Sequence, residues 1–364
     1  MKRFGVVLWV LIFIALIGGV VLVTGSWNRD QGLAQIVSTK QVKKENCELV
    51  VKSREFNREP YYNGPLIDDH LHMPVSSSVV SSVSVTMGLP SPSWDKTLTT
   101  DYLNCLSESL GTKQTIGFYL LTKFSSAGEV SMAKKIEKKY PGKIAHFLMP
   151  SLFNSFINVD AKTFSDALEK NPNLFKGIGE IKTFDNRELD DPFLMELYGL
   201  AEKHKLIVMI HPFHHQKAKV EKILKQYSKV NFLFHGGEEN ANIIFELMKS
   251  YPNAYYSLDA DITSIYGWER QNNDNQPNRE QWLAYVRKNF DGVLDQSSAE
   301  RWKRRLESFP DRVLWGTDRW YRWHFDTEVV GLINEISRNF IGRLDLTMQE
   351  KFAYKNAQKL FNLR

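Results

Sequence analysis

The chain has 364 residues, of which 43% are hydrophobic and 24% charged, so it has the composition of an ordinary globular protein with enough residues for a large core. Its 47 basic and 42 acidic residues give a net charge of only +5, without a block of lysine and arginine among aromatic residues, which argues against a nucleic-acid-binding protein. The two cysteines form no Cys-x-x-Cys motif, which argues against a zinc finger or a thioredoxin-like site.

The N-terminus carries an uncharged apolar run, Gly5 to Val23, directly after Lys2 and Arg3. As a helix this run would be about 28 Å long, close to the roughly 30 Å hydrocarbon core of a bilayer. We interpret residues 1–25 as a membrane anchor with its basic end in the cytoplasm. The alternative is a long signal peptide that is cleaved, which would make the protein secreted. Both readings place the remaining chain outside the cytoplasm, in the periplasm or the extracellular space.

Residues 26–63 are polar and weakly patterned, and we interpret them as a spacer between the membrane and a folded domain at 64–364. In an oxidising compartment, Cys47 and Cys105 could form a disulfide. Two separate buried thiols are the alternative.

From Pro65 onward, short apolar runs of strand length alternate with longer segments of helical periodicity. The predicted strands are Leu66–His70, Thr115–Leu121, Ile144–Met149, Lys176–Lys182, Leu206–His211, Val230–His235, Ala254–Leu258 and Arg312–Trp315. The predicted helices are 100–110, 129–140, 161–170, 191–204, 217–227, 240–250, 279–289, 298–308, 326–340 and 347–362. Two longer connections interrupt this rhythm: a Ser/Val-rich loop at Ser76–Ser93 and a polar insertion after the seventh strand.

Eight strand–helix units in one series predict a parallel sheet that closes into a (β/α)8 barrel, the TIM barrel. An open doubly wound sheet is the alternative. That fold more often carries a glycine-rich phosphate-binding motif after its first strand. This sequence has Asp69-His70-Leu71-His72 there instead.

Metal-binding residue types stand at the ends of five predicted strands. They are His70 and His72 on the first strand, Glu180 on the fourth, His211 on the fifth, His235 on the sixth and Asp318 on the eighth. Residues i and i+2 of a strand face the same side, so the first two histidines project together, as two ligands of one ion would. Active sites of such barrels lie at the carboxyl ends of the strands, where all six groups would converge. Any one of these histidines alone could be structural, but the joint pattern predicts a metal site.

The order of these motifs resembles that of the amidohydrolase superfamily: His-x-His, Glu in Gly-Ile-Gly-Glu-Ile, two single histidines, and Asp in Trp-Gly-Thr-Asp. The similarity is closest to the amidohydrolase-2 branch, which includes amidases, lactonases and decarboxylases, and it covers roughly residues 65 to 363. The resemblance implies a divalent metal, expected to be Zn²⁺. Its expected ligands are His70, His72, His211 and Asp318.

The resemblance also implies that Asp318 acts as the general base, beside a metal that activates water and polarises a carbonyl. His235 would be a ligand of a second metal or, in a one-metal enzyme, a catalytic residue that polarises the substrate or positions water. In many two-metal members a modified lysine on the fourth strand bridges the metals, and in others a glutamate does. Glu180 and Lys182 both face into the predicted barrel, and either could take that place. We favour one ion with Glu180 close by, with two ions as the alternative.

Two further expectations concern residues beside these motifs. Arg319 could clamp a carboxylate or phosphate of the substrate, with a salt bridge at the barrel rim as the alternative. Strict alternation along the first strand predicts that Asp68 points into the ring and that Asp69 lies outside it.

These features favour a membrane-anchored, extracytoplasmic metal-dependent hydrolase that acts on a small amide, ester or lactone. Three alternatives remain at this point. The same site could decarboxylate an unsaturated carboxylic acid, it could hydrolyse a phosphoester, or the domain could bind metal without catalysis.

Overall fold

The computed structural model describes residues 51–363, apart from 53, 77–91, 153–157, 184–186, 264–277 and 295. The chain divides into two units, Met1–Asn46 and Cys47–Arg364, and the fold is that of the second unit. The predicted N-terminal helix lies outside the described residues. Within the described part of the chain, no helix is both long and apolar enough to cross a bilayer.

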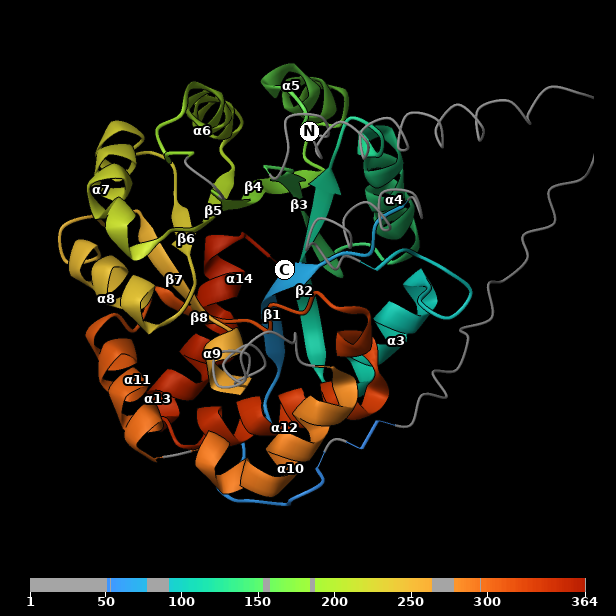
Figure 1. Ribbon diagram of the computed structural model, residues 1–364, viewed down its shortest axis with the longest axis vertical. Coiled ribbons are helices and arrows are strands. Elements are labelled where there is room, and N and C mark those ends of the chain that lie inside the picture. Colours follow the sequence, from blue (N-terminus) through green and yellow to red (C-terminus); the bar gives the residue numbers. More distant parts are fainter. Residues whose placement is uncertain are drawn as a thin grey trace, which may run out of the picture. The chain divides into compact units, whose positions relative to one another are not determined.

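The second unit is built on eight parallel strands, each of which pairs with the next in sequence order (Figure 1). The strands are β1 Leu66–His72, β2 Thr112–Leu121, β3 Ile144–Pro150, β4 Phe175–Lys182, β5 Ile207–His211, β6 Phe232–Phe234, β7 Ala254–Leu258 and β8 Val313–Trp315. The segment after β8 closes the ring onto β1, because Asp318 N donates to His70 O at 2.8 Å and His72 N donates to Arg319 O at 3.1 Å. The predicted (β/α)8 barrel is thus confirmed.

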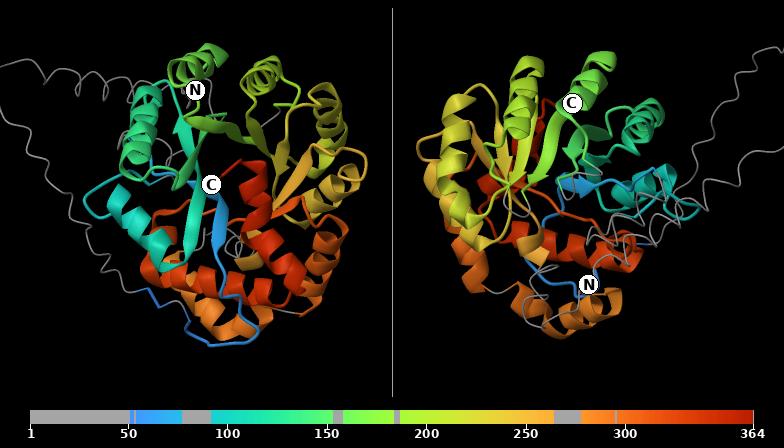
Figure 2. Two further views of the ribbon diagram at one scale, coloured as in Figure 1. Left: turned by 180° about the vertical axis from the view of Figure 1, so that it is seen from behind. Right: turned by 45° about the horizontal axis from the view of Figure 1, so that its top comes forward.

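The helices lie mostly outside the ring of strands, as both views in Figure 2 show, while the last of them crosses one end of the ring (Figure 1). They are α3 Thr100–Ser109, α4 Ser126–Lys139, α5 Ala161–Lys170, α6 Pro192–His204, α7 Lys217–Gln226, α8 Glu238–Leu247, α9 Ala260–Thr263, α10 Arg279–Val293, α11 Gln296–Ser308, α12 Thr327–Gly342, α13 Leu346–Glu350 and α14 Asn356–Leu360. Short 3-10 turns stand at η1 His214–Gln216 and η3 Arg322–Phe325, and a π-helical segment, η4 Lys351–Lys355, joins α13 to α14.

Two hydrophobic cores follow from the alternation of side chains along the strands. The larger one lies between the strands and the helices and includes Leu66, Leu71 and Ile178. The smaller one includes Ile67 and Phe147 among strand residues of the opposite face, together with Ala357 and Phe361 from the C-terminal helical segment. Asn356 donates to the carbonyl of Val313, the first residue of β8, so α14 closes the amino end of the barrel. The carboxyl end is therefore the end that can hold a site.

A bulge in β1 changes which of its residues face inward. Asp68 pairs with Thr115 of β2 and Leu71 pairs with Gly117, so three steps along β1 match two along β2. The alternation therefore shifts by one residue within Asp68–Leu71. Asp69 accepts a hydrogen bond from Ser257 Oγ of β7 at 2.6 Å, whereas Asp68 pairs with residues that follow β8. The prediction that Asp68 points inward and Asp69 outward was wrong, because it assumed a regular strand.

The expected spacer at 26–63 ends earlier than predicted, because its described part packs on the barrel domain. Glu335 of α12 accepts backbone hydrogen bonds from residues 55, 56 and 57. Arg338 of the same helix donates to the carbonyls of Tyr62 and Gly64. The ring of Phe56 stacks on Phe290 of α10 with centroids 4.0 Å apart. The compact unit accordingly begins at Cys47 and not at residue 64.

Cys105, on α3, is disulfide-bonded. Cys47 is the only other cysteine in the chain, so these two residues form the pair. Of the two alternatives left open by the sequence, the structure has the disulfide.

Replacing Cys105 with Ser is expected to lower the free energy of unfolding by about 4 kcal/mol, because the cross-link closes a loop of roughly 60 residues in the unfolded chain. Urea unfolding of the wild type and of Cys105→Ser measures the difference. Reduction of the wild type should lower its stability to that of the variant. Equal stability of the oxidised wild type and the variant would show that the bond contributes nothing.

Glu129, in the first turn of α4, ties the start of the loop after β1 to the barrel. Its carboxylate accepts from both the backbone N (2.7 Å) and the Oγ (2.8 Å) of Ser76. The loop is also pinned by Val75, whose N donates to Pro92 O and whose O accepts from Trp94 N. Glu129 is fully buried, and this burial raises its pKa to about 7.

This raised pKa predicts that stability falls as pH rises. The folded protein binds the proton of Glu129 more tightly than the unfolded chain does, and this difference stabilises the fold. The stabilisation is complete below pH 4.5, the pKa of the glutamate in the unfolded chain, and it is lost as the pH rises through about 7, the pKa in the folded protein. Glu129→Gln cannot ionise and should reduce the loss of unfolding free energy between pH 5 and pH 8 by roughly 3 kcal/mol. Urea unfolding of both proteins at the two pH values tests this. The same pH dependence in both would contradict it.

Candidate metal centre

The carboxyl ends of the strands bring the six predicted groups together. In β1, His70 and His72 both turn toward the carboxylate of Asp318. The distances from their Nε2 atoms to Asp318 Oδ1 are 3.5 and 3.2 Å. The stacked ring of Trp320 covers one face of His72, with centroids 4.4 Å apart. Asp318 is slightly exposed, at 13%, whereas both histidines are buried.

Glu180 lies at the centre of the cluster and is itself only 2% exposed. Its Oε1 lies 2.7 Å from His235 Nε2 and 3.2 Å from His211 Nδ1, both within hydrogen-bond distance. Its other oxygen, Oε2, lies 3.5 Å from His72 Nε2. The two oxygens of one carboxylate therefore face histidines from different parts of the ring.

Gly179 explains how Glu180 reaches this position. Three steps along β4, from Ile178 to Ile181, match two along β5, so β4 carries a bulge at this point. Gly179 has φ +133°, and a Cβ there would lie 2.4 Å from the carbonyl oxygen of Met209. Only glycine fits this position, which is why Gly-Glu rather than another pair stands at the strand end.

Within the described residues, the candidate ligands fall into overlapping groups whose ligand atoms lie within 4.8 Å of one another. One group is His70, His72 and Glu180, another is Glu180, His211 and His235, and a third is His70, His235, Asp259 and Asp318. The four ligands expected around a single ion, His70, His72, His211 and Asp318, are thus divided among these groups. Glu180 is the member that the first two groups share.

The sequence interpretation missed Asp259, which directly follows β7. Its Oδ2 accepts from His70 Nδ1 at 2.9 Å and lies 3.3 Å from His235 Nδ1. The rule that located the other groups, an ionisable residue at the carboxyl end of a strand, also applies to this position. It was passed over because the family motifs contain no counterpart on the seventh strand.

Burial and the neighbouring charges set the protonation of the cluster. Burial lowers the pKa of His72 to about 4 and that of His211 to about 3, so both rings are neutral near pH 7. Burial also opposes a charge on His235, but the carboxylates of Glu180 and Asp259 outweigh it and raise the pKa of His235 well above its usual value. Burial raises the pKa of Asp318 to about 7.

Lys182 lies beside the cluster, and its Cα pairs with that of His211 across β4 and β5. After burial, its positive charge is the next largest factor that lowers the pKa of His211. It also lowers the pKa of His72. These effects agree with the prediction that Lys182 faces the site.

The backbone around Asp318 is held by its two neighbours. Asp318 has φ +50°, a left-handed conformation that Asp and Asn adopt more readily than most residues. Thr317 Oγ1 donates to Asp68 Oδ2 at 2.7 Å, and Arg319 Nη2 donates to the same oxygen at 3.1 Å. Both flanks of Asp318 are thereby fixed to β1.

This arrangement argues against the expectation that Arg319 binds substrate. The side chain is 3% exposed, and its guanidinium pairs with Asp68 and lies over the ring of Phe325. A clamp for a substrate carboxylate needs an accessible guanidinium, and this one is used within the protein.

The cluster fits a divalent metal ion. The Nε2 atom of His70 is buried and has no hydrogen-bond partner, although its Nδ1 is paired with Asp259. His72 and His211 are held in the neutral form that binds metals. The carboxylates of Glu180 and Asp318 add oxygen ligands, and a set of imidazoles and carboxylates is the donor set that zinc prefers.

Comparisons with known proteins agree with this reading of the fold. Residues 150–363 match the family model described as Amidohydrolase, the amidohydrolase-2 family. A zinc-bound amidohydrolase from Burkholderia multivorans matches 83% of this chain and 100% of its own, with 13% identity and a TM-score of 0.54. A Pseudomonas putida protein that carries the name 2-pyrone-4,6-dicarboxylic acid hydrolase matches 82% of this chain and 97% of its own, with 13% identity and a TM-score of 0.51.

At this level of identity the two structures show a shared fold. No match was found among curated protein sequences. The family model covers more than half of the chain, and its range contains Glu180, His211, His235 and Asp318. The chain therefore belongs to the amidohydrolase superfamily, in its amidohydrolase-2 branch, and is an enzyme of that family.

Proposed function

We propose that the protein is a metal-dependent hydrolase that cleaves a small ester, lactone or amide outside the cytoplasm. The observation that carries the proposal is the buried cluster at the carboxyl end of the barrel, where the unpaired Nε2 of His70 faces the carboxylate of Asp318. The family membership supports hydrolysis as the reaction class.

We assign the candidate ligands to two adjoining positions that share Glu180. His70 and His72, with Asp318, would hold the first ion, and His211 and His235 the second. Support comes from the two oxygens of Glu180, which face His72 on one side and His211 and His235 on the other. This assignment replaces our initial preference for one ion. Zn²⁺ is the expected metal, since the ligands are nitrogen and oxygen donors.

A divalent cation bound there would act as a Lewis acid that polarises the scissile carbonyl and makes water more acidic. The protein's own residues would then handle the proton. Asp318, which is fixed through its flanking residues and is slightly exposed, would accept the proton from the attacking water and pass it to the leaving group. His235 would bind an ion through Nε2, while its Nδ1 pairs with Asp259 and so fixes the orientation of the ring.

Two features support a location outside the cytoplasm. The apolar run from Gly5 to Val23 has the length of a membrane span, and Cys105 is disulfide-bonded, which is typical of proteins from oxidising compartments. We propose that residues 1–25 anchor the enzyme or, if they are cleaved, direct its secretion. A C-terminal reporter that is active only in the cytoplasm should stay inactive, and an active reporter would contradict the proposal.

The reaction is tested by screening the full chain, loaded with zinc, against esters, lactones, amides, phosphoesters and unsaturated carboxylic acids. Turnover within the first three classes is expected, with loss after chelation and recovery after zinc is restored. Turnover confined to phosphoesters would make the enzyme a phosphoesterase, and release of carbon dioxide would make it a lyase. Metal-replete protein that turns over none of the compounds would favour a metal-binding module.

A further inference from the structure

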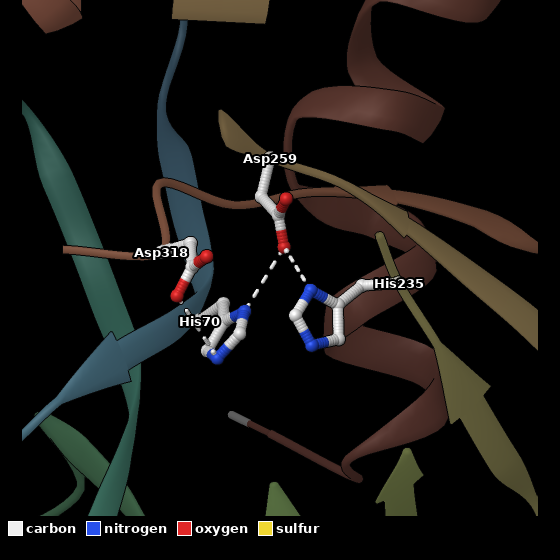
Figure 3. Close-up of side chains that lie close together, drawn as sticks. All are labelled: His70, His235, Asp259 and Asp318. Carbon is white, nitrogen blue, oxygen red and sulfur yellow. Dashed lines mark hydrogen bonds and ion pairs between the residues drawn. The ribbon is translucent and has the colours of Figure 1, made fainter. Parts of the chain in front are cut away.

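Asp259 joins two histidines that come from distant strands of the ring. It directly follows β7 and is 3% exposed. Its Oδ2 accepts a hydrogen bond from His70 Nδ1 at 2.9 Å and pairs with His235 Nδ1 at 3.3 Å. Figure 3 shows this oxygen between the two rings, which stand 4.5 Å apart and nearly perpendicular, at 85°. One carboxylate oxygen thus contacts the same atom type in both rings.

These contacts determine which nitrogen of each ring faces the centre. An imidazole that donates its Nδ1–H to a carboxylate carries its lone pair on Nε2 when it is neutral, and the carboxylate increases the basicity of that nitrogen. The Nε2 of His70 then points toward Asp318 at 3.5 Å. The Nε2 of His235 lies 2.7 Å from Glu180 Oε1, where it carries a proton until an ion takes the place of that proton. Both atoms face the space between the candidate ligands.

The surroundings hold Asp259 in this orientation. Ile262 N donates to its carbonyl at 3.1 Å, so the residue is anchored at the start of α9. Ser257, two residues earlier on β7, donates to Asp69 at 2.6 Å and lies 3.4 Å from Asp259 Oδ2. The carboxylate is thereby directed at the two imidazoles and away from solvent.

We propose that Asp259 is a positioning residue of the metal centre, which fixes His70 and His235 together in the Nδ1–H form and so sets the affinity of the centre for its ion. The inference rests on the proposed metal-dependent function. It adds a seventh strand-end residue to the six that the family pattern contains. Asp259 acts through the two histidines and is not itself assigned as a ligand.

The test compares zinc affinity among three variants of the full chain. Asp259→Asn has the same shape without the charge, and Asp259→Leu removes the acceptor as well. Asp261→Asn, an identical substitution at an exposed residue two positions further along, is the matched control. We expect zinc affinity, measured by competition with a chelator, to fall roughly 10- to 100-fold in Asp259→Asn and at least as far in Asp259→Leu, and to stay unchanged in Asp261→Asn.

A second readout follows the histidines directly. In zinc-loaded protein labelled with 15N-histidine, NMR should show Nδ1–H for both His70 and His235, assigned through His70→Gln and His235→Gln. The Nδ1–H signals should shift in Asp259→Asn, and in Asp259→Leu they should be lost to exchange with solvent. If the leucine variant does not fold, the isosteric asparagine variant decides the question. Wild-type zinc affinity in Asp259→Asn, or a bare Nδ1 on either ring of the wild type, would overturn the inference.

Neither readout uses a substrate. Failure to find hydrolysis would therefore remove the proposed reaction without touching the role of Asp259. Unchanged affinity in the Asp259 variants would remove that role and leave the hydrolase proposal standing.

Discussion

Asp318→Asn is expected to reduce turnover roughly 10³-fold while the protein remains folded, because a general base contributes about 10²- to 10⁴-fold to such reactions. The amide cannot accept a proton and is a weaker metal ligand than the carboxylate. The fold should tolerate the change, since asparagine adopts the left-handed conformation at φ +50° as readily as aspartate does. The bond from the backbone N of residue 318 to His70 O does not depend on the side chain.

The control is the same substitution, aspartate to asparagine, at a residue outside the site. Asp311 lies just before β8, at the amino end of the strand that Asp318 follows, and it pairs at the surface with Lys351. Asp311→Asn should keep wild-type kcat and KM on the substrate found in the screen. Circular dichroism and thermal unfolding establish that both variants are folded. An Asp318→Asn enzyme with kcat close to that of the wild type would exclude Asp318 as the base.

The sequence predicted the barrel because eight repeated strand–helix units leave few other arrangements. The positions of the six groups followed from the same pattern, since each stands where an apolar run ends. All six groups lie at the carboxyl end of the ring in the structure: His70, His72, Glu180, His211, His235 and Asp318. Their function as ligands stays a prediction, because it depends on a bound ion.

The errors came from local backbone geometry that residue patterns do not encode. Alternation failed at Asp68 and Asp69 because β1 carries a bulge, and nothing in Leu66–His72 marks its position. Glu180 also stands beside a bulge, but there Gly179 gave a usable signal, since a glycine inside a strand often accompanies one. The helical segment at α9 is only one turn long and shows no periodicity.

Long-range polar contacts were also invisible in the sequence. The apolar residues of segment 54–63 follow no regular spacing that would predict packing. Glu335 and Arg338 nevertheless bind its backbone from a helix almost three hundred residues away in the sequence. For a similar reason the sequence could not decide whether Arg319 clamps a substrate or forms a salt bridge at the barrel rim. Its partner, Asp68, lies on the first strand, and only closure of the ring between β8 and β1 brings the two residues together.

Glu180→Gln is expected to lower the metal content from two ions per chain to one. The glutamate is the one residue shared by the two adjoining ligand groups, and its buried carboxylate faces histidines of both. Glutamine keeps the shape and one oxygen but loses the negative charge, so it cannot balance a second divalent ion in a site that is only 2% exposed. Metal analysis of protein purified in the presence of zinc measures the change.

Lys182→Gln is the matched comparison, because Lys182 lies two residues along the same strand and was the alternative candidate for the shared position. The lysine variant should keep two ions, since Glu180 and not Lys182 stands within 3.5 Å of the histidines of both groups. Loss of an ion in Lys182→Gln but not in Glu180→Gln would move the shared position to the lysine. One ion per chain in the wild type would instead restore a single site, with Glu180 as a hydrogen-bond partner of His211 and His235.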